Sequence, residues 1–180
     1  MIENDVMIKT FVYNYSHELE EYYTVKKTKF LSIDDPLAGI AAKKILEENN
    51  LDYLAGYIFL SYDGKPVFTE ERTETECLLT TWLDLSRILR EEEDKEFEIC
   101  FLDNADGNAI IKKEAGNYVI TLQKRKQGPA DTFTIPAEKL KEAVRKNFVK
   151  FIGFCRQSNL VFSKESLYSN ALEEYEKIKG

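Results

Sequence analysis

Glycine, proline and long apolar runs are all scarce in this sequence. Its 180 residues include 8 glycines and 4 prolines, far from the composition of fibrous or low-complexity chains. No apolar run approaches the roughly 18 residues of a membrane-spanning helix, and Met1 to Asp5 lack the positive segment that begins a signal peptide. We therefore predict a cytoplasmic protein with no membrane partner.

Residues that carry catalysis or bind metals are also few. His17 is the only histidine, and the three cysteines are Cys77, Cys100 and Cys155. The cysteines are widely spaced in apolar surroundings, which predicts reduced thiols in the core. No Gly-x-Ser-x-Gly turn, cysteine pair at metal-ligand spacing or glycine-rich phosphate loop occurs. The sequence thus predicts no cofactor and no metal, and favours a non-catalytic protein over an enzyme.

Charge and hydrophobicity indicate a folded domain that carries a negative charge. Acidic residues number 32 against 25 basic ones, giving a net charge of −7, and 43% of the residues are hydrophobic. A charge of this sign repels nucleic acid and anionic membranes and favours a basic protein as partner. The length and composition predict a single globular domain over residues 1–180.

In the first third of the chain we expect two strands and a helix. Residues 6–15 and 22–31 are rich in β-branched and aromatic types and predict two strands joined by a turn at 17–20. Asp34-Asp35-Pro36 predicts an N-cap for a helix that reaches about Asn49. The residues expected on the inner face of this helix are Leu37, Ile40, Ala41, Ile45 and Leu46.

Two local signals follow in the middle of the chain. Asp63-Gly64 between two apolar runs predicts a tight β-hairpin over residues 57–68. Thr73 and Glu76 have the spacing of a capping box and predict the start of a helix that carries Trp82. Segments 97–102, 109–113 and 118–124 predict a three-stranded meander.

The rest of the chain predicts helices that cover the strands. After Pro136, one face of a long helix is apolar, and its inward residues are Leu140, Ala143, Val144, Phe148, Phe151, Ile152 and Cys155. A last helix follows Ser163 and makes 163–180 a candidate peripheral segment. Together these elements predict an α+β fold, with an antiparallel sheet of hairpins and a meander packed against about four helices.

The strongest candidate for a binding surface is acidic. Glu91, Glu92, Glu93 and Asp94 stand at the end of the Trp82 helix, where the helix dipole favours cations instead. Such a broken rule is typical of functional surface. With Glu70, Glu71, Glu74 and Glu76 before the same helix, these residues could form a two-part acidic face for a basic partner. The alternative is a solvated helix end and linker.

Tyrosines crowd the first third of the chain, where Tyr22 and Tyr23 are candidate interface residues. Exposed tyrosines are good interface anchors, because they offer a large contact area at a small cost in entropy. Buried tyrosines would only pack the sheet.

Two other classes of function remain open. The first is a metal-dependent hydrolase or transferase that uses scattered carboxylates, with Asp103, Asp106 and His17 as candidate ligands. A calcium loop at 103–107 does not fit, because its spacing places Lys113 where a bidentate carboxylate is required. The second is a regulatory or structural subunit, and the sequence leaves the oligomeric state open.

The run from Gly56 to Ile152 resembles the small bacterial immunity proteins that neutralise polymorphic toxins. The similarity lies in the hairpin at 64–68, the Trp82-x-x-Leu85 helix, the meander and the helix that begins after Pro136. It implies an acidic, cytosolic, single-domain protein that binds a cognate toxin and has no catalysis of its own. It carries no site residues to this chain.

Overall fold

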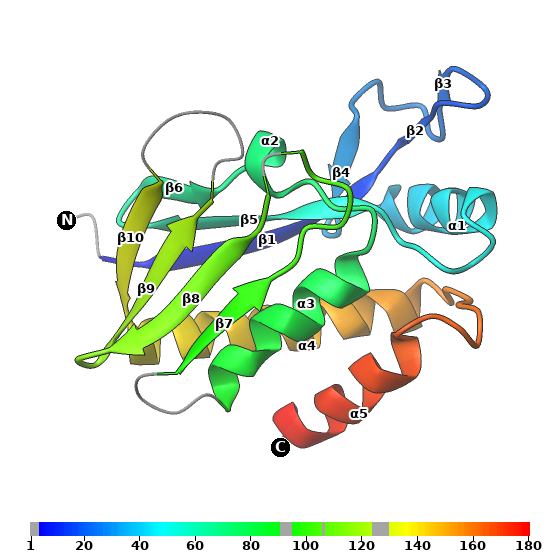
Figure 1. Cartoon of the computed structure of the whole chain (residues 1–180). Coiled ribbons are helices and arrows are strands. Elements are labelled where there is room, and N and C mark those ends of the chain that lie inside the picture. The colour runs from blue at the N-terminus through cyan, green and yellow to red at the C-terminus, as the bar shows by residue number, and fades with distance from the viewer. Residues whose placement is uncertain (1–3, 91–94, 106, 124–129) are drawn as a thin grey trace.

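Two antiparallel sheets of four strands each form the framework of the molecule (Figure 1). The computed structural model describes residues 4–90, 95–105, 107–123 and 130–180. The first sheet has the order β4-β1-β5-β6, with β1 (Val6–Tyr13), β4 (Phe30–Ser32), β5 (Gly56–Tyr62) and β6 (Lys65–Phe68). The second has the order β10-β9-β8-β7, with β7 (Glu96–Ile99), β8 (Ala109–Glu114), β9 (Asn117–Leu122) and β10 (Asp131–Pro136). The predicted α+β class is confirmed, with the strands divided between these two sheets and a further two-stranded one.

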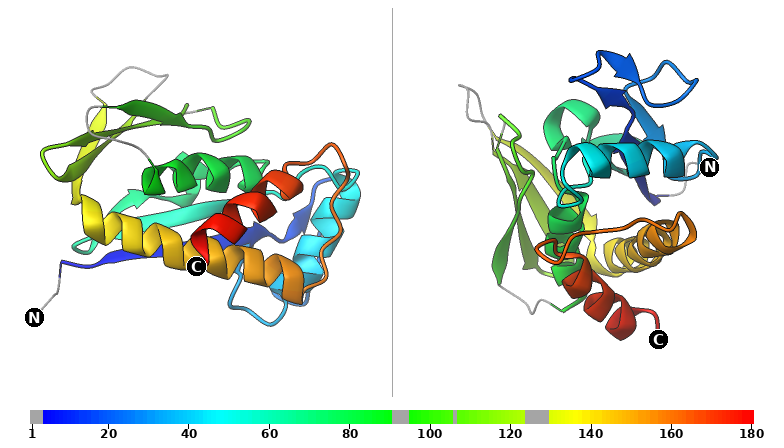
Figure 2. Two further views of the ribbon diagram at one scale, coloured as in Figure 1. Left: turned by 90° about the horizontal axis from the view of Figure 1, so that it is seen from below. Right: turned by 90° about the vertical axis from the view of Figure 1, so that its right-hand side faces the viewer.

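Helices lie against both sheets, as the two views of Figure 2 show. They are α1 (Ala38–Glu48), α2 (Glu70–Thr73), α3 (Leu78–Ser86), α4 (Ala137–Gln157) and α5 (Tyr168–Ile178), with a 3₁₀ turn, η1 (Arg87–Leu89), after α3. The long helix α4 packs across β1 and also contacts β9, β10 and α3. Among the described residues, none of these helices has the length and apolar character needed to cross a bilayer.

The core is centred on Trp82 of α3. Its ring centroid lies 5.9 Å from that of Phe148 and 6.0 Å from that of Phe151, both on α4. Its indole Nε1 donates a hydrogen bond of 3.2 Å to Thr10 Oγ1 on β1, so the polar atom of this buried ring is satisfied. The predicted inner face of α4 is confirmed, since all of its residues are buried except the half-buried Ala143.

The hairpin β5–β6 forms as predicted. Asp63 and Gly64 both adopt the left-handed backbone conformation, with φ of 51° and 73°, which a two-residue hairpin turn of this type requires. The three predicted meander strands are also present, and β10 adds a fourth by pairing with β9. Of the cysteines, Cys77 and Cys155 are buried and Cys100 is half-buried, and all three are free thiols.

The predicted capping box is wrong. Helix α3 begins at Leu78 without a side-chain cap. The Thr73 hydroxyl donates instead to the carbonyl oxygens of Ile58 and Thr69, at 3.0 and 2.8 Å, and so ties α2 to the neighbouring strand. The pattern failed because Thr73 is the last residue of α2, and the helix that carries Trp82 begins only at Leu78.

The predicted inner face of α1 is wrong at one position. Ile40 is 47% exposed, whereas Ala38, Ala41, Ala42, Ile45 and Leu46 are buried. Their spacing of three and four residues defines a face that excludes position 40. At the start of the helix, Asp35 Oδ1 accepts a 2.9 Å bond from the Leu37 amide, although the regular helix begins only at Ala38.

The predicted second strand at 22–31 is also wrong over most of its length. Residues 14–29 form a projecting arm, which contains only the short strands β2 (Tyr15–Ser16) and β3 (Glu21–Tyr22) (Figure 1). The arm closes on Asn14, which is fully buried. Asn14 Nδ2 donates to the carbonyl oxygens of Lys26 and Thr28, both at 3.0 Å. A side chain thus takes the place of strand pairing in this segment.

Candidate functional site

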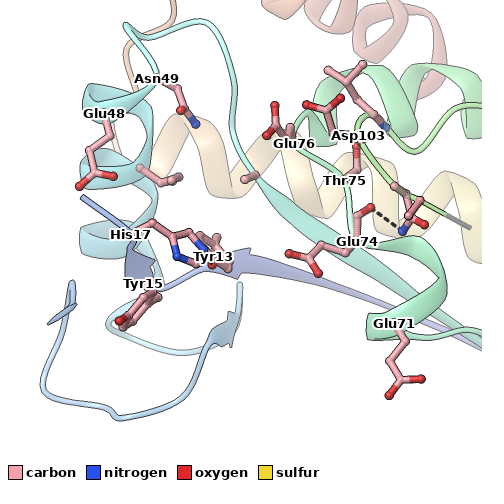
Figure 3. Close-up of a pocket in the computed structure, with 15 residues that line it drawn as sticks. Tyr13, Tyr15, His17, Glu48, Asn49, Glu71, Glu74, Thr75, Glu76 and Asp103 are labelled. Atoms are coloured by element: carbon pink, nitrogen blue, oxygen red, sulfur yellow. Dashed lines mark hydrogen bonds between the residues drawn. The ribbon is translucent and has the colours of Figure 1, made fainter. Parts of the chain in front are cut away.

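A cavity of about 480 Å³ opens where the arm meets the body of the molecule (Figure 3). Five segments surround it: the arm with the end of β1, the end of α1, the residue before β5, α2 with its connection to α3, and the loop that follows β7. The residues that line it are Tyr13, Tyr15, His17, Ile45, Glu48, Asn49, Ala55, Glu71, Glu74, Thr75, Glu76, Leu102, Asp103, Asn104 and Ala105.

Aromatic side chains form the wall on the arm side. The Tyr13 hydroxyl and His17 Nε2 are 2.6 Å apart and share a hydrogen bond. The Tyr15 ring meets the His17 ring edge to face, with centroids 5.3 Å apart. Burial, followed by the nearby charge of Glu74, raises the pKa of Tyr13 to about 12, so its hydroxyl stays protonated at neutral pH. This wall therefore presents the rings of Tyr13 and Tyr15 and a protonated Tyr13 hydroxyl.

Carboxylates form the opposite wall. Glu76 and Asp103 point toward each other, and Glu74 reaches across toward Tyr13 and His17 (Figure 3). Burial raises the pKa of Glu76, and its hydrogen bond to Asp103 and the charge of that group raise it further. Lys29 contacts Glu74 at 3.4 Å, but both side chains are more than 40% exposed, so this ion pair is weak. The cavity therefore holds more negative charge than its own cations neutralise.

Hydrogen bonds fix the loop that carries Asp103. Asn104 Nδ2 donates to the Glu74 carbonyl oxygen at 2.9 Å. The Leu102 amide donates to Thr75 Oγ1 at 3.1 Å, and the Glu76 amide donates to the Leu102 carbonyl oxygen at 3.0 Å. Asp103 itself has a positive φ of 60°. These bonds bring residues from distant parts of the chain together, so the acidic wall is preformed.

Glu48 has a structural task at the edge of the cavity. One of its carboxylate oxygens accepts a hydrogen bond from the Ser16 hydroxyl, and the other accepts one from the Tyr23 hydroxyl at 2.7 Å. Both partners belong to the arm, so Glu48 of α1 fastens the arm to the body. Burial and the bond to Glu48 raise the pKa of Tyr23. With its two oxygens engaged, Glu48 is less available to a ligand than Glu74, Glu76 or Asp103.

The structure brings part of the predicted acidic face together. Glu71 and Glu74 line the cavity, while Glu70, the first residue of α2, is not among its lining residues. Glu91, Glu92, Glu93 and Asp94 lie outside the described residues. The predicted two-part face is thus visible only at the end that precedes α3.

The two candidate tyrosines have different places in the arm. Tyr23 is 7% exposed and its hydroxyl is bound to Glu48, so it packs the arm against α1. Tyr22 is half-buried, with its ring edge to face on Tyr15 at 5.2 Å and Lys27 Nζ 5.5 Å above it. Tyr22 therefore remains at the surface near the cavity.

Sequence reasoning considered Tyr13 and Tyr15 only as members of the group of tyrosines in the first third of the chain, and it did not assign Glu48 to a site. Each belongs to an element whose pattern indicates only a strand or a helix. One usable signal is the position of Tyr13. It is the last residue of the apolar strand β1, and a turn that contains His17 follows four residues later, so its hydroxyl can meet that histidine. Nothing in the local sequence of α1 distinguishes Glu48 from its neighbour Glu47.

His17 and Asp103, two of the candidate metal ligands, line the same cavity. The third, Asp106, lies outside the described residues. Within the described ranges, no three histidine, cysteine, aspartate or glutamate side chains are grouped so that they could hold a metal ion. The chemistry that the cavity shows most clearly is the recognition of a cationic group by carboxylates and aromatic rings.

No protein-family model, curated protein or solved structure matches this chain.

Proposed function

We propose that this chain is a non-catalytic binding domain that recognises a basic protein partner through the cavity between the arm and the α2–α3 connection. The observation that carries the proposal is the preformed wall of Glu74, Glu76 and Asp103 facing the rings of Tyr13 and Tyr15. A lysine or arginine side chain of the partner would enter between these walls. The net charge of −7 would speed its approach by long-range attraction.

The raised pKa of Glu76 supports this choice of ligand. When both are ionised, the carboxylates of Glu76 and Asp103 repel each other, and a cation can take the place of the proton that otherwise joins them. A guanidinium group also suits the site because its planar fork can bind both carboxylates at once and stack on a tyrosine ring. Binding thus relieves an unfavourable feature of the free protein.

The finer form of the proposal is an immunity function, in which the bound partner is a toxin whose active site becomes blocked. An acidic, preformed cavity suits this role, because enzymes that act on nucleic acids commonly carry basic active-site surfaces. Under this proposal the protein acts in the cytoplasm, where such a toxin would act. Co-expression with the isolated partner should restore growth to cells that the partner alone arrests.

The test compares two triple variants with the same change in charge. The cavity variant is Glu74→Gln/Glu76→Gln/Asp103→Asn. The matched control, Glu114→Gln/Glu138→Gln/Glu142→Gln, removes three exposed carboxylates that do not line the cavity. A partner retained by the wild-type protein from lysate of the native host is identified and purified, and its Kd for each form is measured at two salt concentrations.

We expect the cavity variant to lose at least about 30-fold in affinity, and the control to lose less than about 3-fold. Equal losses in the two variants would show that only bulk charge matters and would overturn the role of the cavity. A wild-type protein that retains no specific partner would contradict the binding function itself.

A metal-dependent hydrolase remains the second candidate, because His17 and Asp103 line one cavity. Calorimetric titration of the purified protein with Mn²⁺ and Zn²⁺ separates the two functions. Stoichiometric binding that Asp103→Asn abolishes would favour the hydrolase.

A further inference from the structure

The arm is held rigidly although most of its residues face solvent. In addition to its two donor bonds, the Asn14 side chain accepts a bond of 3.1 Å from Thr24 Oγ1, and its backbone amide donates to the Lys29 carbonyl oxygen at 2.7 Å. Lys44 of α1 donates to the Tyr23 carbonyl oxygen at 3.0 Å. An exposed loop does not need so many bonds in order to connect two strands, so the arm presents a defined surface.

The turn at the end of this arm presents an apolar side chain to water. Leu19 is 62% exposed, and the turn is fixed by a 3.0 Å bond from the Leu19 amide to Ser16 Oγ. Glu20 adopts a positive φ of 54°, which is uncommon for a residue with a side chain. The neighbours Glu18, Glu20 and Glu21 are all exposed. Leu19 is thus a single apolar group among three carboxylates.

This turn is continuous with the candidate cavity. His17 is the first residue of the turn and also lines the cavity. Tyr15, two residues earlier in the chain, lines the cavity as well. The views of Figures 1 and 2 show the arm projecting from the body beside α1. A partner large enough to cover the cavity would therefore meet the turn as well.

We propose that the turn at residues 17–21 is the second contact of the partner interface, with Leu19 as its anchor. The inference rests on the proposed function and specifies the partner: a protein with an apolar recess bordered by basic side chains, next to the lysine or arginine that enters the cavity. Leu19 fills the recess, while Glu18, Glu20 and Glu21 face its basic border.

Charge and rigidity together select this partner. The three glutamates exclude an acidic or purely apolar surface, because their desolvation would have no compensation there. An apolar group surrounded by polar ones follows the usual anatomy of an interface, in which the buried centre is apolar and the rim is polar. Since the bond from the Leu19 amide to Ser16 and the pairing of Ser16 with Glu21 already order the turn, its binding costs little conformational entropy.

Val25 provides the matched control, since it is also apolar and even more exposed, at 84%. In the sequence it is followed by Lys26 and Lys27, on the return half of the arm, whereas Leu19 stands between Glu18 and Glu20. The inference therefore expects Leu19 and Val25 to behave differently, whereas a general effect of exposed apolar surface would treat them alike.

The experiment uses the full chain with the photo-crosslinking residue p-benzoylphenylalanine at position 19, at position 71 on the cavity rim, or at position 114 as a remote control. Irradiation in cells of the native host is followed by mass spectrometry. The protein captured from both positions 19 and 71 is purified, and its Kd is measured for the wild type, Leu19→Ala, Leu19→Asp, Val25→Ala and the cavity triple variant.

We expect one basic protein to be captured from positions 19 and 71 but not from 114. Leu19→Ala should weaken its binding at least 10-fold and Leu19→Asp at least 100-fold, while Val25→Ala changes it less than 3-fold. The melting temperatures of the Leu19 variants should match that of the wild type, because an exposed side chain contributes little to stability.

The outcomes separate the two proposals. Capture from position 71 alone, or unchanged affinity in the Leu19 variants, would overturn the inference about the turn and leave the cavity proposal standing. Loss of binding in the Leu19 variants with full binding by the cavity variant would support the turn and contradict the cavity. Capture from neither position would overturn both.

Discussion

The helical core around Trp82 and the arm at residues 14–29 are stabilised by different means. In the core, aromatic and aliphatic side chains of α3, α4 and the two sheets exclude water, and Trp82, Phe148 and Phe151 are fully buried. In the arm, Asn14 and Ser16 are also fully buried, but their side chains are polar and are held by hydrogen bonds. Apolar packing tolerates small shifts, whereas a buried polar network requires all of its partners. The difference indicates that apolar packing in the core determines the fold, whereas the hydrogen bonds of the arm hold an exposed segment in one defined conformation.

The largest expected effect comes from the core. Phe148→Ala removes a fully buried ring beside Trp82 and leaves a cavity, so we expect a loss of about 3–5 kcal/mol in the free energy of unfolding. In the molecules that remain folded, the arm should keep its native conformation. Urea unfolding gives the stability, and partner affinity per folded molecule should equal that of the wild type. A fall in this affinity would show that core and arm are coupled.

The next effect is expected at the centre of the arm. Asn14→Ala leaves the carbonyl oxygens of Lys26 and Thr28 without their donor, which should cost about 1–3 kcal/mol. Unlike the core variant, it should release the arm while the rest of the molecule stays folded. Hydrogen exchange should show faster exchange of the amides at 15–29 and unchanged protection in α4. Asn14→Asp, which keeps the size but loses both donors, should behave similarly, whereas protection lost throughout the chain would refute a local role.

A smaller effect is expected where the arm is fastened to α1. Tyr23→Phe removes only the hydroxyl that donates to Glu48, and we expect a loss of about 0.5–1.5 kcal/mol. The ring remains buried, so the packing of the arm should persist. Thermal unfolding measures the change, with Tyr22→Phe as the control, because its ring stands at the surface beside Tyr15. A larger loss from Tyr22→Phe would mean that the Tyr22 hydroxyl contributes more to stability than the bond from Tyr23 to Glu48.

The smallest effect is expected in the cavity, and its sign depends on pH. Because the folded-state pKa of Glu76 is raised above its ordinary value of 4.5, the contribution of this group to stability is fully present below that value. It is lost as the pH rises through the folded-state pKa. Glu76→Gln should therefore be more stable than the wild type at pH 7, by less than about 1 kcal/mol given the exposure of the group. The two forms should be equally stable near pH 4, as urea unfolding at both pH values can show.

The parts of the fold that sequence reasoning predicted correctly depend on neighbours in the chain. The turn at Asp63-Gly64 needs only two residues that tolerate positive φ, and the inner face of α4 follows from helical periodicity. The capping box at Thr73 and the strand at 22–31 were wrong for a common reason. In both places a side chain bonds to carbonyl oxygens well away in the sequence, Thr73 to that of Ile58 and Asn14 to those of Lys26 and Thr28. Local patterns contain no information about such partners.

The candidate site was predictable only in part for the same reason. Glu71 and Glu74 were expected because they stand close together in the sequence, and the structure places both at the cavity. Tyr13 and Asp103 are 90 residues apart, and only the pairing of strands and the loop bonds to Thr75 and Glu74 bring them to one cavity. His17 and Asp103 were candidate metal ligands, but nothing in the sequence indicated that they would line the same cavity.

The burial of Asn14 also bears on how the protein can be produced. Asn14-Tyr15-Ser16 is an acceptor sequence for N-linked glycosylation. In the folded protein the amide nitrogen has no solvent exposure and donates to two carbonyl oxygens, so a sugar cannot be attached there. A chain directed through a eukaryotic secretory pathway would meet the glycosylating enzyme before folding, and an oligosaccharide at Asn14 would prevent the arm from closing. Secreted expression in yeast or mammalian cells should therefore give a protein with an open arm, while expression in the bacterial cytoplasm should give the closed form.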